Sequence, residues 1–255
     1  MKKKGTNEIR AIKIIEIENN KEEFMKEIDN ELKNMAICSK ENENSVKYYE
    51  YYYYNENYKD KIAIVMEFCD NNLQKILDKR KEGFKIKEIY NIISQLNNTF
   101  KIMCENNIIH RDIKLENILI KYNSNNNYIV KLTDYGISKQ LINTIGKTFL
   151  GTPLTMAPEI LEGDNNYDYK CDLWSIGIII YQLYFKEYPY KGATPVAIYQ
   201  KIINLGKTIL KKTNDDDLDN LIDSLLIKNS RERINYEEYF NHPFFKKSIL
   251  ILKIK

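Results

Sequence analysis

Few residues in this sequence could bind a metal through sulfur or imidazole. Its 255 residues include four cysteines and two histidines, and the cysteines are far apart with no C-x-x-C pair. Zinc sites and disulfide frameworks need such ligands at short, regular spacings. The sequence therefore indicates neither, and its isolated cysteines are typical of a reducing compartment.

Long hydrophobic runs and a strong charge of one sign are also missing. The longest apolar run, SIGIIIYQLYF at 175–185, is too short to span a bilayer, and no apolar stretch follows the N-terminal MKKK. The net charge of +3 is too small to favour nucleic acid. We therefore expect a soluble cytoplasmic protein with no nucleic-acid partner and no membrane insertion.

The first part of the chain is predicted to be rich in β-strand. Residues 8–17 alternate in polarity, and 46–55 and 61–68 are rich in tyrosine or β-branched residues, which favours strands. Between them, residues 21–37 place four apolar side chains on one face of a helix, namely Phe24, Ile28, Leu32 and Met35.

From about residue 72 the pattern turns mainly helical. Two short strands, 118–122 and 128–134, flank a polar NSNNN loop. The fold class is therefore α+β, with a small β-rich lobe at 1–70, a larger helical lobe at 71–246 and a short tail at 247–255. The apolar spacing predicts helices over 72–82, 86–106, 172–186, 194–205, 215–227 and 235–245.

The polar residues that carry chemistry gather in an irregular region. The runs IIHRDIKLENILI (108–120) and KLTDYGISK (131–139) place carboxylates, an amide and a lysine in or beside loops. Asn117 and Asp134 supply oxygens of the kind that Mg²⁺ prefers. Asp112 and Lys114 can point the same way from an extended loop, one accepting a hydroxyl proton and the other neutralising a phosphate. A solvated polar loop is the alternative interpretation of these residues alone.

The order of these runs matches a known family. H-R-D-x-x-x-x-N at 110–117, D-x-G at 134–136 and A-P-E at 157–159 resemble the eukaryotic protein kinases, and the resemblance covers roughly residues 6 to 245. It implies a two-lobed fold, ATP as the cofactor and proteins as substrates. It also implies roles for the residues above: Asp112 as catalytic base or hydroxyl orienter with Lys114 beside it, and Asn117 and Asp134 as Mg²⁺ ligands.

The same resemblance implies which residues hold the nucleotide. Lys13, in AIK, matches the strand lysine that binds the α- and β-phosphates. We prefer Glu31 to Glu27 as its ion-pair partner, and IVMEFC at 64–69 matches the hinge with Met66 as gatekeeper. The other candidates are the backbones of Glu67 and Cys69 at the adenine edge, and Ala11 and Leu119 around the base, unless these last two are plain core residues.

Lys114 also implies the substrate class, because serine/threonine kinases of this family carry lysine two residues after the catalytic aspartate. Thr152, in G-T-P, is the matching feature and would hydrogen-bond Asp112 and Lys114. Tyr135 replaces the usual phenylalanine of D-F-G and keeps its shape. The later helices look most like the autophagy-initiating subgroup of serine/threonine kinases.

One part of the family pattern is not found. A G-x-G-x-x-G hairpin is expected roughly fifteen to twenty residues before Lys13, but Gly5 is the only glycine that precedes it. We expect the strands of this phosphate lid to be absent, which exposes a sheet edge and weakens ATP binding. Two interpretations stay open. The matching catalytic residues favour a serine/threonine kinase with an incomplete N-terminus, and the alternative is a catalytically impaired kinase-like binding or scaffolding module.

A switch is predicted in the loop 135–156. Arg111, directly before Asp112, is typical of kinases that depend on a phosphorylated activation loop. Thr148 lies four residues before Thr152, where the family places its activating phosphothreonine, and Thr144 is the alternative. A phosphate on Thr148, added by an upstream kinase or by autophosphorylation, would pair with Arg111 and order the loop.

Overall fold

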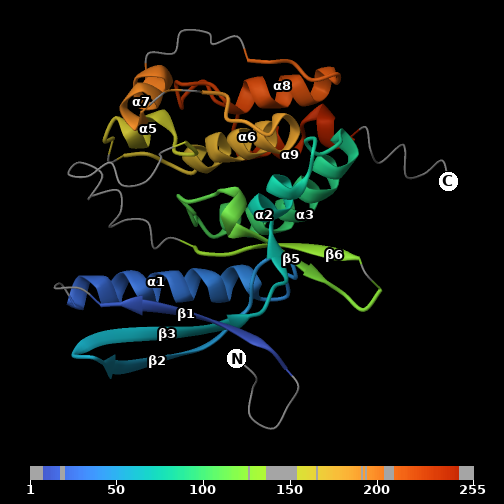
Figure 1. Ribbon diagram of the computed structural model, residues 1–255. Helices are drawn as coiled ribbons and strands as arrows, with labels where there is room; N and C mark the ends of the chain where they lie inside the picture. Colours follow the sequence, from blue (N-terminus) through green and yellow to red (C-terminus); the bar gives the residue numbers. More distant parts are fainter. Residues whose placement is uncertain are drawn as a thin grey trace.

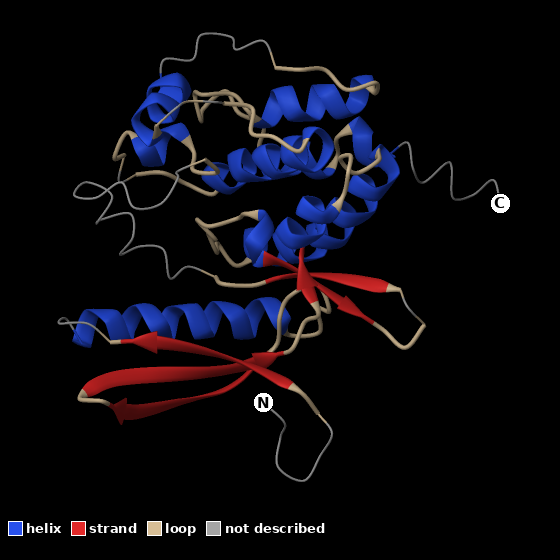
Figure 2. Ribbon diagram, viewed as in Figure 1, coloured by secondary structure: helices blue, strands red, loops and turns tan. Residues whose placement is uncertain are grey.

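The computed structural model describes residues 8–17, 21–125, 127–135, 154–164, 166–190, 192, 194–203 and 210–246. An antiparallel sheet with one long helix forms one end, a larger group of helices forms the other, and a second small sheet lies between them (Figure 1). Figure 2 shows the strands in one half of the molecule and most helices in the other. The predicted α+β class is confirmed, and the lobe boundaries at residues 70 and 246 stay predictions.

The first sheet contains strands β1 (Arg10–Glu16), β2 (Tyr48–Glu56) and β3 (Lys59–Glu67), in the order β1-β3-β2. Helix α1 (Lys21–Ser39) lies along one face of it (Figure 1). The apolar face predicted for this helix is confirmed, because Phe24, Ile28 and Leu32 are buried against Ile62 and Ile64 of β3. Met35, the fourth member of that face, is buried in the larger core that continues into the helical part.

Strand β1 lies at an edge of this sheet. Within the described residues it pairs with β3 alone, from Arg10 opposite Glu67 to Glu16 opposite Lys61. The side chains of Ile12 and Ile14 are 38% and 58% exposed. An edge of this kind offers unpaired backbone groups to a further strand. It is the edge beside which the family pattern places the lid strands.

The second sheet joins the first to the helices. It contains β4 (Asn71–Asn72), β5 (Ile118–Tyr122) and β6 (Tyr128–Leu132), in that order. The hairpin predicted at 118–134 is confirmed by the β5–β6 pairing. Its polar loop folds because Asn123 Oδ1 accepts hydrogen bonds from the backbone N–H groups of Asn125 and Asn127, which is the turn chemistry typical of asparagine.

The helices agree with the sequence prediction to within a few residues, except the last. The predicted helix 235–245 is interrupted, because Pro243 has no N–H to continue it and disfavours helical backbone at His242. The described helices after the first sheet are α2 (Leu73–Lys79), α3 (Ile86–Glu105), the 3-10 turn η1 (Leu115–Asn117), α5 (Pro158–Leu161), α6 (Lys170–Phe185), α7 (Pro195–Ile203), α8 (Asp216–Leu225) and α9 (Tyr236–Phe240).

Helix α6 is the centre of the helical part. Its apolar run is buried almost all round, with Leu173, Trp174 and Ile178 fully inaccessible. The hydrophobicity of residues 175–185 therefore serves packing between protein segments. Among the described residues, every helix is too short or too polar to cross a membrane.

Candidate active site

Three of the predicted catalytic residues meet on the loop between α3 and β5. Lys114 Nζ lies 2.7 Å from Asp112 Oδ2. Asn117 Nδ2 donates to the same oxygen and to the Asp112 carbonyl, both at 2.9 Å. Asn117 is buried at the end of η1, so the short turn fixes its place. Two donors thus hold one carboxylate oxygen of Asp112, which leaves Oδ1 for a further donor.

A fully buried carboxylate on α6 supports this loop. Asp172 accepts hydrogen bonds from the backbone N–H groups of His110 and Arg111, each at 2.8 Å. Burial raises the pKa of Asp172, and the His110 ring and these N–H donors oppose the rise. Arg111 has a φ of 69°, a costly conformation for a residue with a side chain. Asp172 therefore stabilises the strained backbone directly before Asp112.

Lys13 joins β1 to helix α1 and to the segment after β6. Its Nζ lies 2.5 Å from Asp134 Oδ1 and 3.8 Å from Glu31 Oε1. Burial raises the pKa of Glu31 to about 7, although the charge of Lys13 opposes this. The side chain of Glu27, the alternative partner, lies outside the described residues. The structure thus brings the predicted Lys13, Glu31 and Asp134 together.

The residues expected around a nucleotide base lie on β1, at the end of β3 and on β5. Ala11 pairs with Met66 across β1 and β3, and Leu119 of β5 lies opposite Asn72 of β4. Cys69 follows β3. Ala11, Met66, Cys69 and Leu119 are all partly buried, so each keeps some exposed surface, and the contact of Ala11 and Leu119 with a base stays a prediction.

Glu67 has a side-chain role that the sequence analysis missed. Its carboxylate lies 2.6 Å from Lys121 Nζ of β5 and 3.1 Å from Lys131 Nζ of β6. Burial alone would raise the pKa of Glu67, yet the two lysines outweigh it and hold the pKa below its usual value. The backbone N–H of Glu67 donates to the Lys47 carbonyl at 2.8 Å. Glu67 therefore ties the first sheet to the second.

A buried ion pair closes the segment that follows the loop 135–156. Arg233 donates through its two terminal guanidinium nitrogens, Nη1 and Nη2, to the two oxygens of Glu159, at 2.7 and 2.9 Å. The Arg233 side chain is fully inaccessible. Its remaining bonds go to the carbonyls of Ile227, Lys170 and Lys228. Paired so completely, the guanidinium fixes α5 against α6 and the segment before α9.

The predicted switch residues are described only in part. Arg111 is partly buried, and its guanidinium lies 5.6 Å from the centre of the Tyr167 ring. Thr144, Thr148 and Thr152 lie outside the described residues. The phosphorylation switch therefore stays a prediction.

The site therefore has two parts. In one, a lysine of the first sheet contacts an aspartate, and in the other a second aspartate is held by a lysine and an asparagine of one loop. This combination is typical of the phosphoryl-transfer domains found in protein kinases. The protein kinase domain matches residues 1–245 of this chain. The chain therefore belongs to the protein kinase family.

The relatives are protein kinases from several kinds of organism, and two of the following three are named as serine/threonine kinases. Calcium-dependent protein kinase 5 of Plasmodium falciparum is 34% identical over 253 residues, which are 96% of this chain and 42% of the relative. Serine/threonine-protein kinase ATG1c of Arabidopsis thaliana is 34% identical over 188 residues, covering 72% of this chain and 25% of the relative. Serine/threonine-protein kinase unc-51 of Caenorhabditis elegans is 32% identical over 199 residues, covering 74% and 23%.

These matches confirm the resemblance to the autophagy-initiating subgroup that the later helices suggested. The chain spans less than half the length of each of these relatives.

Proposed function

We propose that this protein transfers the γ-phosphoryl group of ATP to serine or threonine hydroxyls of other proteins. The observation that carries the proposal is the Asp112 carboxylate, held through Oδ2 by Lys114 and Asn117. A carboxylate held in this way can accept a proton from a hydroxyl placed against its second oxygen. The adjacent ammonium can neutralise charge on the phosphoryl group.

The step balances with the residues named. The substrate hydroxyl oxygen forms a bond to the γ-phosphorus while the bond from that phosphorus to the β–γ bridging oxygen breaks, which releases ADP. The hydroxyl proton passes to Asp112. The ammonium of Lys114 takes no part in the proton transfer and stabilises the transferring group by its charge.

In this proposal the nucleotide is held by Lys13, Ala11, Leu119 and the backbones of Glu67 and Cys69. Lys13 is placed for phosphates, because it lies in the middle of β1 and its ammonium contacts Asp134 at 2.5 Å, beside the proposed Mg²⁺ position, while Glu31 is farther away at 3.8 Å. The partly buried surfaces of Ala11 and Leu119 suit the faces of a base.

Asn117 and Asp134 fit Mg²⁺ by their donor chemistry. Among the described residues, Asn117 uses its side-chain Nδ2 on Asp112, which leaves its side-chain Oδ1 for a cation, and Asp134 uses Oδ1 on Lys13, which leaves Oδ2. Mg²⁺ takes oxygen ligands of this kind together with phosphates. When bound, the ion neutralises charge on the phosphates.

The same proposal includes regulation by a phosphate on Thr148 that pairs with Arg111. It also places Thr152 beside Asp112 and Lys114 during the reaction. The activating phosphate would come from an upstream kinase or from the protein itself. A cytoplasmic location is also proposed, because the isolated cysteines suit a reducing compartment.

The proposal is tested with radiolabelled ATP, Mg²⁺ and a peptide library rich in serine, threonine and tyrosine. Phosphoserine and phosphothreonine are expected from the parent protein, and Asp134→Asn should abolish transfer. Predominant phosphotyrosine would contradict the substrate class. Nucleotide binding without any phosphoryl transfer would contradict the proposal of an enzyme and would favour a kinase-like binding module.

A further inference from the structure

Tyr135 sits directly after Asp134 and is fully inaccessible to solvent. Its ring packs against the His110 ring, with centroids 5.1 Å apart. The same histidine contacts the Thr133 carbonyl through Nε2 at 2.9 Å and accepts from the Asp112 N–H through Nδ1. The ring of Tyr135 therefore packs on the residue that links the segments before Asp112 and before Asp134.

The hydroxyl of Tyr135 has a partner that a phenylalanine would lack. It donates to Ser45 Oγ at 2.8 Å, and Ser45 is also fully inaccessible. Burial raises the pKa of Tyr135 well above its usual value, so the hydroxyl stays a donor. A buried hydroxyl without a partner costs free energy, so the fold is more stable when the Tyr135 hydroxyl keeps its bond to Ser45.

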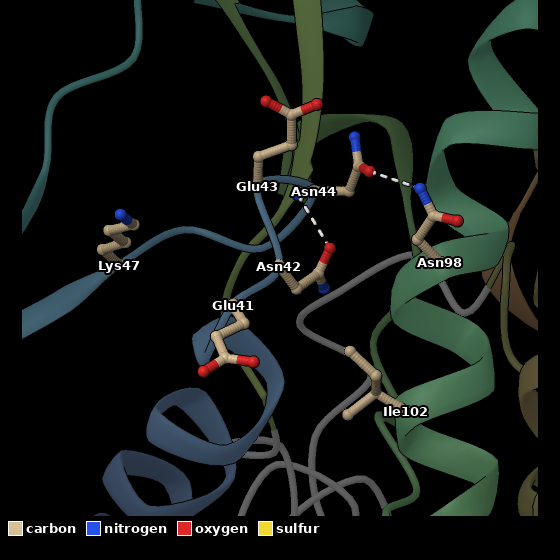
Figure 3. A pocket seen from close by; sticks show the side chains of 7 residues that line it. All are labelled: Glu41, Asn42, Glu43, Asn44, Lys47, Asn98 and Ile102. Carbon is tan, nitrogen blue, oxygen red and sulfur yellow. Dashed lines mark hydrogen bonds between the residues drawn. The ribbon is translucent and has the colours of Figure 1, made fainter.

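Ser45 is held firmly in the loop that follows α1. It forms a bridge with Leu132 of β6, and the Leu132 N–H and carbonyl bond to Asn44 and Val46 on either side of it, at 2.9 Å each. Figure 3 shows Asn44 in turn bonded to Asn98 of α3, at 2.8 Å. The acceptor for Tyr135 is therefore a fixed point of the fold.

The polar cluster around this hydroxyl reaches the C-terminal end of α1. The side chains of Cys38 and Thr99 adjoin the Tyr135 hydroxyl. Asn42 closes the cluster by donating to the Cys38 carbonyl at 2.8 Å and to Thr99 Oγ1 at 3.0 Å. One buried cluster thus joins Tyr135 to the last turn of α1 and to α3.

Helix α1 also carries Glu31, about two turns before Cys38. Glu31 lies 3.8 Å from Lys13, which contacts Asp134 at 2.5 Å. Asp134 is therefore connected to α1 along two routes. Its side chain reaches α1 through Lys13 and Glu31, and its backbone reaches α1 through Tyr135 and the polar cluster.

We propose that the Tyr135 hydroxyl is a positioning group that holds Asp134 at a fixed place relative to α1, so that Lys13, Glu31 and Asp134 stay together before nucleotide arrives. The hydroxyl touches neither nucleotide nor metal in this role. The inference rests on the proposed function, in which Asp134 is a Mg²⁺ ligand. It also explains what tyrosine adds in place of the usual phenylalanine, namely a hydrogen bond to Ser45.

The test compares two tyrosines whose rings are equally inaccessible and whose hydroxyls each donate one hydrogen bond. Tyr135→Phe removes the hydroxyl bonded to Ser45, and Tyr239→Phe removes a hydroxyl that donates to Asn97 Oδ1 at 2.8 Å from an equally inaccessible ring on α9. Each variant loses one hydroxyl hydrogen bond of 2.8 Å, and the bond to Asn97 is only partly buried, so Tyr239→Phe should lose no more stability than Tyr135→Phe. The readout is the gain in ADP affinity that Mg²⁺ produces, measured by calorimetry with and without the ion.

Tyr135→Phe should reduce this gain by about threefold to tenfold, the scale expected for one buried hydrogen bond. Tyr239→Phe should leave it unchanged, and Ser45→Ala should reproduce the effect of Tyr135→Phe. An unchanged gain in Tyr135→Phe, or an equal loss in Tyr239→Phe, would overturn the proposal.

Amide hydrogen exchange in the protein without nucleotide provides a second readout that does not depend on the proposed function. Tyr135→Phe should speed exchange in α1 more than Tyr239→Phe does, because the tie to its last turn is lost. If the parent binds no nucleotide, the proposed function fails while faster exchange in α1 still supports the tie. Equal exchange in the two variants would refute it.

Discussion

Lys13 Nζ and Asp134 Oδ1 lie 2.5 Å apart although 121 residues separate them along the chain. The contact brings the edge strand of the first sheet to the segment after the last strand of the second. Because these residues are far apart in the sequence, they come together only when the chain folds. Folding therefore creates the charged centre in which the proposed phosphates would bind.

Stability should depend on the ionisation of Glu31. Burial raises the pKa of Glu31 to about 7 from an ordinary value of 4.5. The folded chain therefore binds this proton more tightly than the unfolded chain, and the free energy of unfolding should fall as pH rises from about 4.5 through about 7. Glu31→Gln removes this dependence, so its stability relative to the parent should increase over that range by up to about 3 kcal/mol.

Urea unfolding of the parent and Glu31→Gln at several pH values measures this difference. Glu105→Gln, at the exposed end of α3, is the control and should follow the parent at every pH. Parallel pH profiles for the parent and Glu31→Gln would contradict the prediction.

Asp112 and Lys114 should affect turnover far more than nucleotide affinity. Asp112→Asn and Lys114→Ala should each lower turnover by at least about a hundredfold, because one acts on the attacking hydroxyl and the other on the transferring group. ADP affinity should change by less than about threefold in the same variants. Asp223→Asn and Lys212→Ala, which break an exposed ion pair of the same kind, serve as matched controls. Comparable losses in affinity and turnover would argue against these roles.

Arg233 should be required for folding of the helical part. Replacing it with methionine leaves Glu159 buried without its partner, which costs about 3 to 5 kcal/mol when one member of a buried pair is removed. Lys212→Met, in an exposed pair, should cost less than about 1 kcal/mol. Chemical denaturation of both variants measures the difference, and similar costs would show that Arg233 is not a structural anchor.

Phosphatase treatment should slow the protein if Thr148 is the activating site. The phosphate would bring up to two negative charges to Arg111, and its removal should therefore lower turnover in the parent. Thr148→Ala and Arg111→Ala should already be slow and should respond little to phosphatase. A fully active Thr148→Ala that stays sensitive to phosphatase would place the switch elsewhere, with Thr144 next to be tested.

A strand added at the edge of β1 should strengthen ATP binding. Adding a glycine-loop hairpin ahead of β1 supplies N–H groups for the phosphates and a partner for the edge that is unpaired among the described residues. Calorimetry should show MgATP binding about tenfold tighter, the scale of roughly two net hydrogen bonds. The same hairpin with proline in its pairing strand should give little gain, because proline removes the ladder donors. Equal affinity with and without the hairpin would refute the prediction.

Much of the fold could be predicted because its signals are local. The apolar face of α1 and the alternation in β1 and β3 follow directly from residue spacing, and Asn123 marks the turn between β5 and β6. The helix predicted over 235–245 was wrong as a single helix, because α9 ends at Phe240. Pro243 is a local signal for this break, but the prediction gave more weight to the apolar spacing.

The catalytic residues were predictable as motifs, but their supports were not. Asp172 holds the backbone before Asp112 from a distant helix, and its place in the sequence does not show which loop its carboxylate meets. The bond from Tyr135 to Ser45 and the use of the Glu67 side chain have no sequence signal, because they depend on which segments meet after folding.

The carboxylate of Glu67 has a mechanical consequence. Lys131 of β6 contacts it from a nearly inaccessible position, Lys121 of β5 contacts it from a partly exposed one, and the Glu67 N–H is bonded to the Lys47 carbonyl. Sliding the first sheet across the second would separate Glu67 from the buried ammonium of Lys131, which is expensive. We therefore expect Glu67 to lock the two sheets against sliding, so that Lys13 on the first sheet keeps its position relative to the segment that follows the second.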